Sequence, residues 1–430
     1  MNDRSKYKWS ILILAALTGA FVIGAPATSL AVLFKEIAAD LHLNLVQTGW
    51  IWSIGSLAAI FTSPLSGAID DRFGPKWVIL VGTILVGLTA GMRGLATSFA
   101  SLLLIILLVG GLVPLVTTST YKICGIWFPH RQLGVANGIL AMGMALGALI
   151  GSLLSATVLS PWLGGWRHVM FLYSALAILF CVPWYFTRPA PAPERNRGSG
   201  ISPDPTSRGA GRGATEPGTV PVRQALARIV KLKNVWLLGI TFLGISGCVQ
   251  GLGGYLPLYL RGLGWPGAGA DGALAFLNLM SMIFILPITF WSDRLGARKQ
   301  LLVVMVALIA VGTGVLSVAN GWVVWGAIAL VGMVRDGSTA LLITMVIETD
   351  GVGPVYAGTA TGLVMFFFFV GNLLSPPIGN RLADVFPGLP FVFWAGLVAL
   401  GIVSLVFAKS SRPENASTGL RANPTPSQPQ

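Results

Sequence analysis

The stretch "GAIDDRFGPK", residues 67–76, separates two long apolar runs. A related stretch, "TFWSDRLGARK", residues 289–299, stands between two apolar runs in the second half of the chain. Both contain Asp-Arg-x-Gly followed closely by a basic residue, and Asp71 and Asp293 lie 222 residues apart. Nearly the same distance separates the apolar runs that open the two halves. The sequence therefore predicts an internal repeat whose two copies are in register.

The composition is that of a membrane protein. The 430 residues are 54% hydrophobic and only 10% charged, with a mean hydropathy of +0.78, whereas soluble domains carry about 25% charged residues. This is too little charge to cover a globular surface. The net charge of +13 is therefore interpreted through the placement of the basic residues, and no nucleic acid is expected as a partner. The three cysteines show no disulfide or metal-ligand spacing, so we expect no metal and no cofactor.

Twelve apolar runs are long enough to cross a bilayer, which takes about 20 helical residues. Lipid offers no hydrogen bonds to the backbone, and the runs show no strand-like alternation, so they should be helices. We predict an all-α membrane protein whose twelve transmembrane helices form two pseudo-symmetric six-helix bundles. The predicted spans are 9–34, 46–69, 76–95, 98–126, 133–158, 168–187, 235–260, 272–292, 300–319, 322–347, 356–380 and 389–408.

The basic residues predict the orientation, because cytoplasmic loops are enriched in Lys and Arg. With both termini in the cytoplasm, 21 of the 28 Lys and Arg residues are cytoplasmic and two lie within spans. The remaining five lie outside; they are Lys35, Arg93, Arg167, Arg261 and Arg381.

The same pattern divides the chain into four parts. Residues 1–187 form the first bundle and 235–408 the second. Between them, 188–234 is a cytoplasmic linker that is rich in Pro, Gly, Ser and Arg and should be disordered. Its end, "VRQALARIVKLK" (222–233), is either a short basic amphipathic helix on the inner membrane surface or a solvated linker end. Residues 409–430 are predicted to be a disordered cytoplasmic tail.

The fifth span, "GVANGILAMGMALGALIGSLL" (134–154), is rich in glycine. Gly138, Gly143, Gly147 and Gly151 are typical of the small-xxx-small spacing that lets two membrane helices approach closely. We expect this span to pack tightly against a neighbour.

One span carries two charges near its centre, in "GMVRDGSTA" (332–340). An arginine at the middle of a membrane helix costs about 2.5–3.5 kcal/mol on insertion scales. Neighbouring helical residues point about 100° apart, so we expect that Asp336 does not neutralise Arg335 and that each needs its own partner. Arg335 should share a face with Ser338 and Thr339. The alternative for Arg335 is a structural ion pair.

Further candidates lie on other spans. In "TTSTYKICG" (117–125), Thr118 and Lys122 are helical neighbours four residues apart, and Tyr121 lies beside them. Lys122 lies near the cytoplasmic end of the span, so it also fits a side chain that reaches the membrane surface. The additional candidates for the central cavity are Gln250, Tyr255, Asn278 and Asn372.

Carboxylates are scarce in the spans: spans one, four and seven contain none, and Asp336 is the only candidate for a buried acid. We therefore expect an anionic substrate, held by a guanidinium whose geometry suits a carboxylate.

The repeated loop motif resembles that of the major facilitator superfamily, Gly-x-Leu-x-Asp-Arg-x-Gly-x-Lys. Ile69 stands in place of the leucine, and the second copy is less complete. The resemblance implies two six-helix halves, a binding site near the midplane and alternating access, with the loop residues acting as latches. The residues that match the motif are Gly67, Asp71, Arg72, Gly74, Lys76, Asp293, Arg294, Gly296 and Arg298.

Two further stretches, "GIWFPHRQLGVANGI" (125–139) and "VGPVYAGTATGL" (352–363), resemble the anion-carrying branches of that superfamily, such as nitrate, cyanate and oxalate-formate porters. We predict a monomeric secondary active transporter of a small organic or inorganic anion in a bacterial inner membrane. Its partners would be the lipid bilayer, the anion, and a coupling proton or counter-anion. The alternatives are a proton-driven exporter of hydrophobic compounds and a transport-inactive receptor or scaffold. No nucleophile–base or metal constellation is present in the loops, so an enzyme is not expected.

Overall fold

The computed structural model describes residues 3–128, 132–187, 222–295 and 298–408. Over these ranges the chain is helical and contains no strand. The first half comprises α1 (Asp3–Thr18), η1 (Gly19–Gly24), α2 (Ala25–Leu41), α3 (Leu45–Ser53), α4 (Gly55–Phe73), α5 (Pro75–Met92), η2 (Arg93–Leu95), α6 (Phe99–Trp127), α7 (Leu133–Leu154), η4 (Ser155–Leu159), α8 (Ser160–Leu163), α9 (Trp166–Leu179) and α10 (Cys181–Phe186). The second half comprises α11 (Val222–Ile229), α12 (Lys233–Gly262), α13 (Gly267–Leu295), α14 (Arg298–Val315), α15 (Trp322–Ile347), α16 (Gly353–Leu382) and α17 (Leu389–Phe407).

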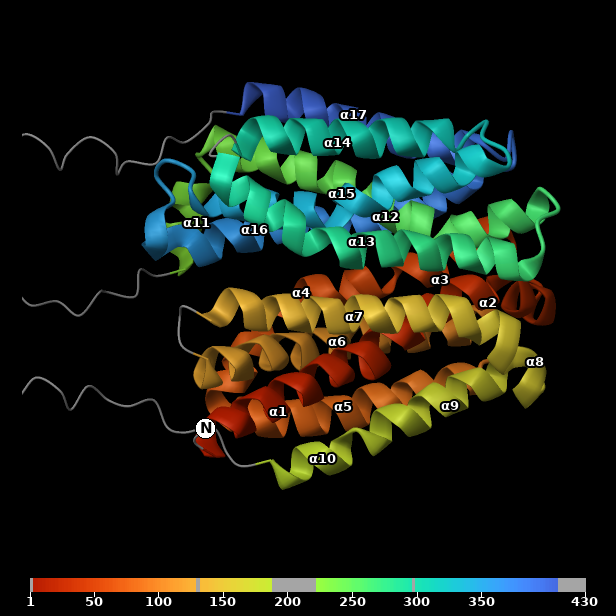
Figure 1. Ribbon diagram of the computed structural model, residues 1–430, viewed down its shortest axis with the longest axis horizontal. Coiled ribbons are helices and arrows are strands. Elements are labelled where there is room, and N and C mark those ends of the chain that lie inside the picture. Colours follow the sequence, from red (N-terminus) through yellow and green to blue (C-terminus); the bar gives the residue numbers. More distant parts are fainter. Residues whose placement is uncertain (1–2, 129–131, 188–221, 296–297, 409–430) are drawn as a thin grey trace, which may run out of the picture.

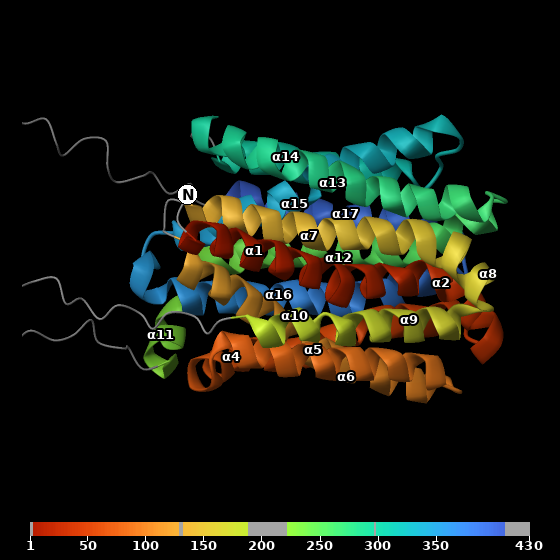
Figure 2. The same cartoon turned by 60° about the horizontal axis from the view of Figure 1, so that its bottom comes forward.

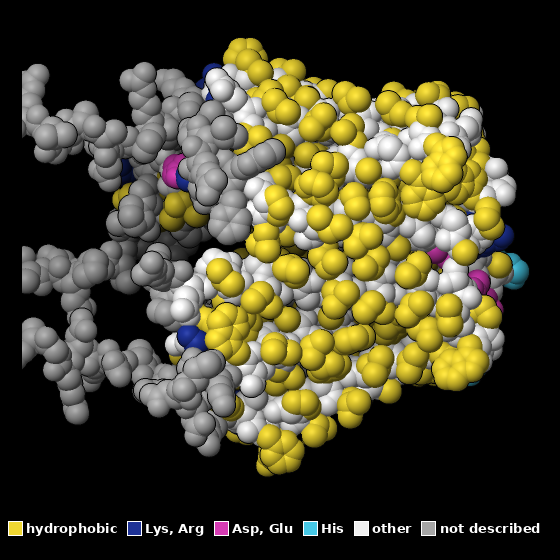
Figure 3. Space-filling model, in the orientation of Figure 1, with side chains coloured by type: hydrophobic (Ala, Val, Ile, Leu, Met, Phe, Trp, Pro, Cys, Tyr) yellow, Lys and Arg dark blue, Asp and Glu magenta, His cyan; other side chains and the backbone are white. Residues whose placement is uncertain are grey.

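The described residues contain 12 helices that are long and apolar enough to cross a membrane, which confirms the predicted fold class. Some of these helices are longer than predicted. The first span, which comprises α1, η1 and α2, extends to Leu41, and the eighth span, formed by α13, begins at Gly267. Glu36 and Asp271 therefore lie inside helices, although the sequence placed them in loops. In the space-filling view, hydrophobic side chains cover the middle of the molecule and charged ones gather towards its two ends (Figure 3).

The two halves form two bundles that lie side by side (Figure 1) and overlap in the view turned by 60° (Figure 2). The start of α1 and the end of α17 lie at the same end of the molecule, which we term the proximal end; the opposite end is the distal end (Figure 1). The loop motif after α4 and the helix α11 also lie at the proximal end. The helix α11 packs against α16, with Ala225 and Ile229 buried and the Arg228 guanidinium 4.9 Å from the Tyr356 ring centroid.

Local sequence explains where several helices begin and end. Asn44 and Gln47 form a reciprocal capping box at the start of α3, and Ser98 and Ser101 do the same for α6. The helix α4 ends at Gly74, whose φ of 80° lies in a region that favours glycine. Pro75 then opens α5, where a missing backbone N–H is harmless. The loop motif therefore encodes a sharp turn between two spans.

The glycines of α7 allow close packing as predicted. A Cβ atom added to Gly143 or Gly147 would lie 2.4 Å or 2.1 Å from the carbonyl oxygens of Ala16 and Ala20, respectively. At Gly151 it would lie 2.4 Å from the oxygen of Ala25. The first and fifth spans thus pack backbone to backbone. Gly138 does not belong to this contact, because it faces Leu286 of the second bundle.

Several pairs of helices form the contacts between the bundles, among them α4 with α16 and α2 with α12. The helices α7 and α13 pack against each other, and α3, at the distal start of the second span, packs against α16. Gly49 of α3 lies so close to Pro377 that an added Cβ would be 2.8 Å from its Cα. Asn380 donates to the Leu45 carbonyl at 2.8 Å. The two bundles are therefore in tight contact at the distal end.

Candidate functional site

A cluster of four polar side chains joins α13 and α15 within the second bundle. The Arg335 Nε and Nη2 donate to the two carboxylate oxygens of Asp336 at 2.9 and 3.1 Å. The Nη1 of Arg335 donates to the Asn278 Oδ1 at 3.2 Å. Ser281 donates its hydroxyl to Asp336. The charges near the centre of the predicted span are thus held by each other and by two polar residues of α13.

The expectation that Arg335 and Asp336 cannot pair was wrong. Their Cβ atoms do diverge, but the long arginine stem lets the guanidinium fold back onto the neighbouring carboxylate. A guanidinium has five N–H bonds, and the contacts with Asp336 and Asn278 use three. Within the described part of the chain, the other two N–H bonds of Arg335 have no hydrogen-bond partner, and 16% of the side-chain surface is exposed.

Ser281 was missed by sequence reasoning, although a signal was present. It follows Asn278 by three residues in α13, so both lie on one helical face. That face meets α15, and both residues are buried.

Ser338 and Thr339, which were expected to share a face with Arg335, lie beside it. Their hydroxyls donate to the backbone carbonyl of Arg335, at 2.7 and 3.4 Å, and not to a ligand-facing group.

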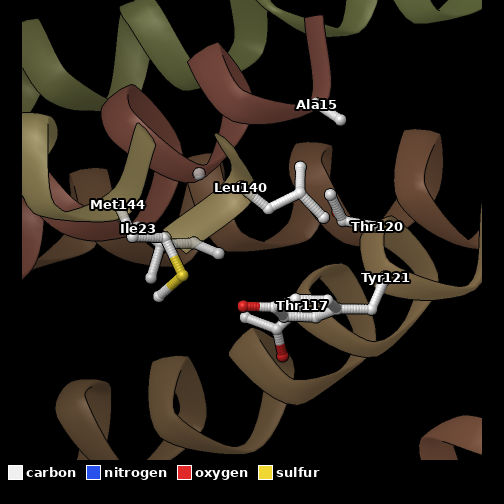
Figure 4. Close-up of a pocket in the computed structure, with 8 residues that line it drawn as sticks. Ala15, Ile23, Thr117, Thr120, Tyr121, Leu140 and Met144 are labelled. Carbon is white, nitrogen blue, oxygen red and sulfur yellow. The ribbon is translucent and has the colours of Figure 1, made fainter. Parts of the chain in front are cut away.

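On α6, which forms the fourth span, the candidate residues lie in two different environments. Thr117, Thr120 and Tyr121 line a small pocket with residues of α1 and α7 (Figure 4). Its volume of about 10 Å³ is enough for about one water molecule, so no organic anion fits there in this conformation. Thr118 lies outside the pocket lining and accepts a hydrogen bond from Ser66 at 2.9 Å.

Lys122 is held by the loop motif. Its Nζ lies 2.5 Å from the Asp71 Oδ1, with the two side chains 32% and 78% exposed. Lys76 donates to the carbonyls of Tyr185, at 3.0 Å, and of Thr187. The first copy of the motif thus ties the loop to span four through one ion pair and to the end of span six.

The other motif residues differ in their surroundings. Arg72 is exposed, and its guanidinium lies 5.4 Å from the Phe73 ring centroid. Gly67 has open space around it. In the second copy, Arg298 pairs with Glu348 at the end of α15. The side chains of Asp293 and Arg294, and the whole of Gly296, lie outside the described residues.

Gln250 and Tyr255 lie on α12, apart from the Arg335 cluster. Gln250 bridges the two bundles. Its backbone carbonyl accepts a hydrogen bond from the Trp52 Nε1 at 2.7 Å, and its side-chain Nε2 donates to the Trp52 backbone carbonyl at 3.2 Å. Tyr255 is buried and donates to the Pro387 carbonyl at 3.0 Å. Asn372 is buried in α16. The structure therefore brings together Arg335, Asp336 and Asn278 but places Gln250 in the contact between the bundles.

Two other acids are buried, whereas 34% of the Asp336 side chain is exposed, so the expectation that Asp336 is the only buried acid was wrong. Asp271 is 0% exposed and lies 2.6 Å from the Arg261 Nη2. Asp70, which precedes Asp71 of the loop motif, is 1% exposed. Sequence reasoning placed both in loops because the ends of α4 and α13 extend beyond the apolar runs. Among the described residues, no group of three metal-ligating side chains is present.

Two six-helix bundles that comprise 12 candidate spans are an architecture known among membrane transporters. Residues 16–376 match the model of the Major Facilitator Superfamily, and the chain belongs to this family. The chain is therefore a multi-pass membrane transporter rather than an enzyme, and the predicted resemblance is confirmed.

Relatives with several kinds of transport are similar to this chain. Monocarboxylate transporter 13 of Bos taurus is 27% identical over 88% of this chain and 83% of its own. A probable nitrate/nitrite antiporter, NarK1, of Thermus thermophilus is 26% identical over 87% and 85%, respectively. The multidrug resistance protein MdtG of Dickeya zeae is 25% identical over 94% and 95%.

Solved structures support the fold. A bacterial homologue of the human lysosomal transporter Spinster, in an inward-facing and unoccupied conformation, has a TM-score of 0.70 with 17% identity and covers 94% of each chain. The nucleoside transporter NupG has a TM-score of 0.74 with 15% identity, over 93% of this chain and 99% of that one.

Proposed function

We propose that this protein is a secondary active transporter that moves a small organic or inorganic anion by alternating access. The observation that carries the proposal is Arg335, a partly buried guanidinium in a membrane span with two N–H bonds left for a ligand. Asp336 occupies the Nε edge of the guanidinium. The edge formed by the two terminal nitrogens has the fork geometry that binds planar oxyanions.

The relatives support an anion of this kind. Monocarboxylates and nitrate, which occur in the names of two relatives, are both planar groups that offer adjacent oxygen atoms. A guanidinium can bind either of them with two parallel hydrogen bonds. In this proposal Asn278 orients Arg335, and Ser281 holds Asp336 away from the free edge.

The charges of the cluster favour coupling to a second ion. Arg335 and Asp336 together are neutral, so an added anion leaves the site with a net charge of −1 in a medium where unbalanced charge is costly. Protonation of Asp336 would restore neutrality, and so would exchange for a counter-anion. We therefore propose anion–proton symport or anion exchange, in a protein that acts as a monomer.

The proposed orientation follows from the basic residues. Lys76, Lys122, Arg298 and Lys299 lie at the proximal end with both described termini, and this end should therefore be cytoplasmic. We accordingly propose that the protein resides in a bacterial inner membrane with both termini in the cytoplasm. The tight contacts of α3 with α16 then close the path from the outside, as expected for one of the two access states.

Thermal unfolding of the detergent-purified protein, with and without added anions, tests the proposal. Acetate, lactate and nitrate are compared with choline and glucose. An anion at about 100 times its dissociation constant should stabilise the folded protein by about 2.7 kcal/mol. Arg335→Gln should fold and lose this shift. The control Arg381→Gln removes an exposed arginine and should retain it.

The opposite pattern would contradict an anion site at Arg335. It would consist of equal shifts in wild type and Arg335→Gln, or of no shift with any anion. Stabilisation by hydrophobic cations alone would instead favour an exporter of hydrophobic compounds; MdtG, one of the relatives, is named a multidrug resistance protein.

A further inference from the structure

Two neighbouring acids at the end of α4 have opposite environments. Asp71 is 78% exposed and paired with Lys122. Asp70 is 1% exposed, and its Oδ2 is buried with no hydrogen-bond partner among the described residues. Only its Oδ1 has a partner, the hydroxyl of Ser119 on α6. A buried carboxylate with one bare oxygen is costly, whereas a protonated acid carries no charge to desolvate.

The number of hydrogens available at Ser119 also indicates that Asp70 is protonated. A serine hydroxyl has one hydrogen and can accept two further bonds. Ser119 Oγ lies 2.6 Å from the Leu115 carbonyl, which can only accept, and it also contacts Asp70 Oδ1. If the single hydrogen of Ser119 goes to Leu115, the contact with Asp70 needs a hydrogen on Asp70. The geometry then contains a carboxylic acid that donates to Ser119.

The charged groups around Asp70 are few. Asp71 and Arg72 follow it on α4, and Lys122 of α6 is within electrostatic reach. On α5, Lys76 donates to carbonyls at the end of span six. The helix α16, which also packs on α4, carries its charge at the distal end, at Arg381. Lys122 is therefore the cation for which Asp70 and Asp71 compete.

We propose that Asp70 is a proton-binding site that controls the ion pair between Lys122 and Asp71. With the proton on Oδ1, Asp70 is neutral and donates to Ser119, and Lys122 stays on Asp71, as in the structure. When the proton leaves to the proximal aqueous phase, the Asp70 carboxylate attracts the Lys122 ammonium and weakens its hold on the loop. Asp70 lies three residues from the end of α4, about 4.5 Å along the helix axis, so water at that end is near.

The site belongs to the first half alone. With the register of the repeat, the positions of Asp70 and Lys122 correspond to Ser292 and Thr344, which carry no charge. Asp70 also occupies a variable position of the loop motif. The inference does not depend on the charge of the transported substrate, so it stands or fails separately from the proposed anion site.

Infrared spectroscopy of the full-length protein in lipid nanodiscs tests the proposal. Protonated carboxylic acids have a carbonyl stretch that is resolved from the bands of ionised carboxylates. Wild type should show such a band, which disappears as the pH is raised. Asp70→Asn should lose the band. The control Asp384→Asn makes the same change of charge at an exposed acid of the distal end, away from Lys122, and should retain it.

The variant Ser119→Ala tests the direction of the hydrogen bond and does not require that Asp70→Asn folds. If protonated Asp70 donates to Ser119, losing that acceptor moves the midpoint of the band's titration to lower pH. If Ser119 instead donates to an ionised carboxylate, its loss moves the midpoint to higher pH and overturns the proposal. A wild type without the band, or an Asp70→Asn variant with an unchanged band, also overturns it. So does displacement of the band by sodium chloride but not by choline chloride, which would indicate a cation site.

Discussion

The contact between Trp52 and Gln250 should help to hold the two bundles together at the distal side. Trp52→Phe removes the bond from the indole Nε1 to the Gln250 carbonyl, and Gln250→Leu removes the bond from the amide Nε2 to the Trp52 carbonyl. Each bond is worth about 0.5–1.5 kcal/mol net. The two bonds use different atoms, so the double variant should lose about 1–3 kcal/mol of distal closure. Since about 1.4 kcal/mol is a factor of ten, the population with an open distal side should rise roughly 5- to 150-fold.

A cysteine placed at Thr48 reports this opening, because Thr48 is 1% exposed and lies under Asn380 in the closed distal contact. The rate of its modification by a maleimide, in protein held in nanodiscs, should rise by the same factor in the double variant. The native cysteines are buried and provide the background measurement. Trp50→Phe, on the same helix, is the control. A rate that is unchanged in the double variant would refute the assignment of Trp52 and Gln250 to distal closure.

Three other changes follow from the packing and the charges. Gly147→Ala should destabilise the protein by about 1–3 kcal/mol, because the new methyl group meets backbone of the first span; Gly362→Ala, where space is open, should not, and thermal unfolding compares the two. Asp271→Asn should cost about 3–5 kcal/mol, because it leaves the Arg261 charge without its buried partner, and a small effect in denaturant unfolding would show that water reaches this pair. Lys122→Gln should change stability by less than about 1 kcal/mol, because its ion pair is partly exposed, and the difference should vanish in unfolding experiments at high salt.

The charged residues show where sequence reasoning reached its limit. Arg335 and Asp336 are identified as unusual from hydropathy alone, because any charge in a long apolar run is costly. Their mutual pairing was not predictable from helix geometry, since it depends on how the arginine stem bends. Ser281 and Asn278 became partners of the pair only through the packing of α13 on α15, which brings together residues more than 50 positions apart in the chain.

The buried acids show the same limit from the other side. Asp70 follows an apolar run and precedes a basic turn, so its sequence context is that of an exposed loop residue. It is buried because α6 packs over the end of α4 and places Ser119 against it. The sequence context of Gln250 is likewise that of an ordinary polar residue in a span. Its contact with Trp52 arises only because the two bundles pack against each other.

The sequence by itself determined the number of spans, the repeat of two halves, the sharp turn at Gly74 and the close approach of the fifth span. These properties depend on local quantities: the length of apolar runs, the spacing of small residues and the backbone freedom of glycine. Only the tertiary structure decided which charges pair, which acids are buried and which polar residues join the two bundles. Those outcomes depend on contacts between distant helices, where a shift of one helical turn would change every partner.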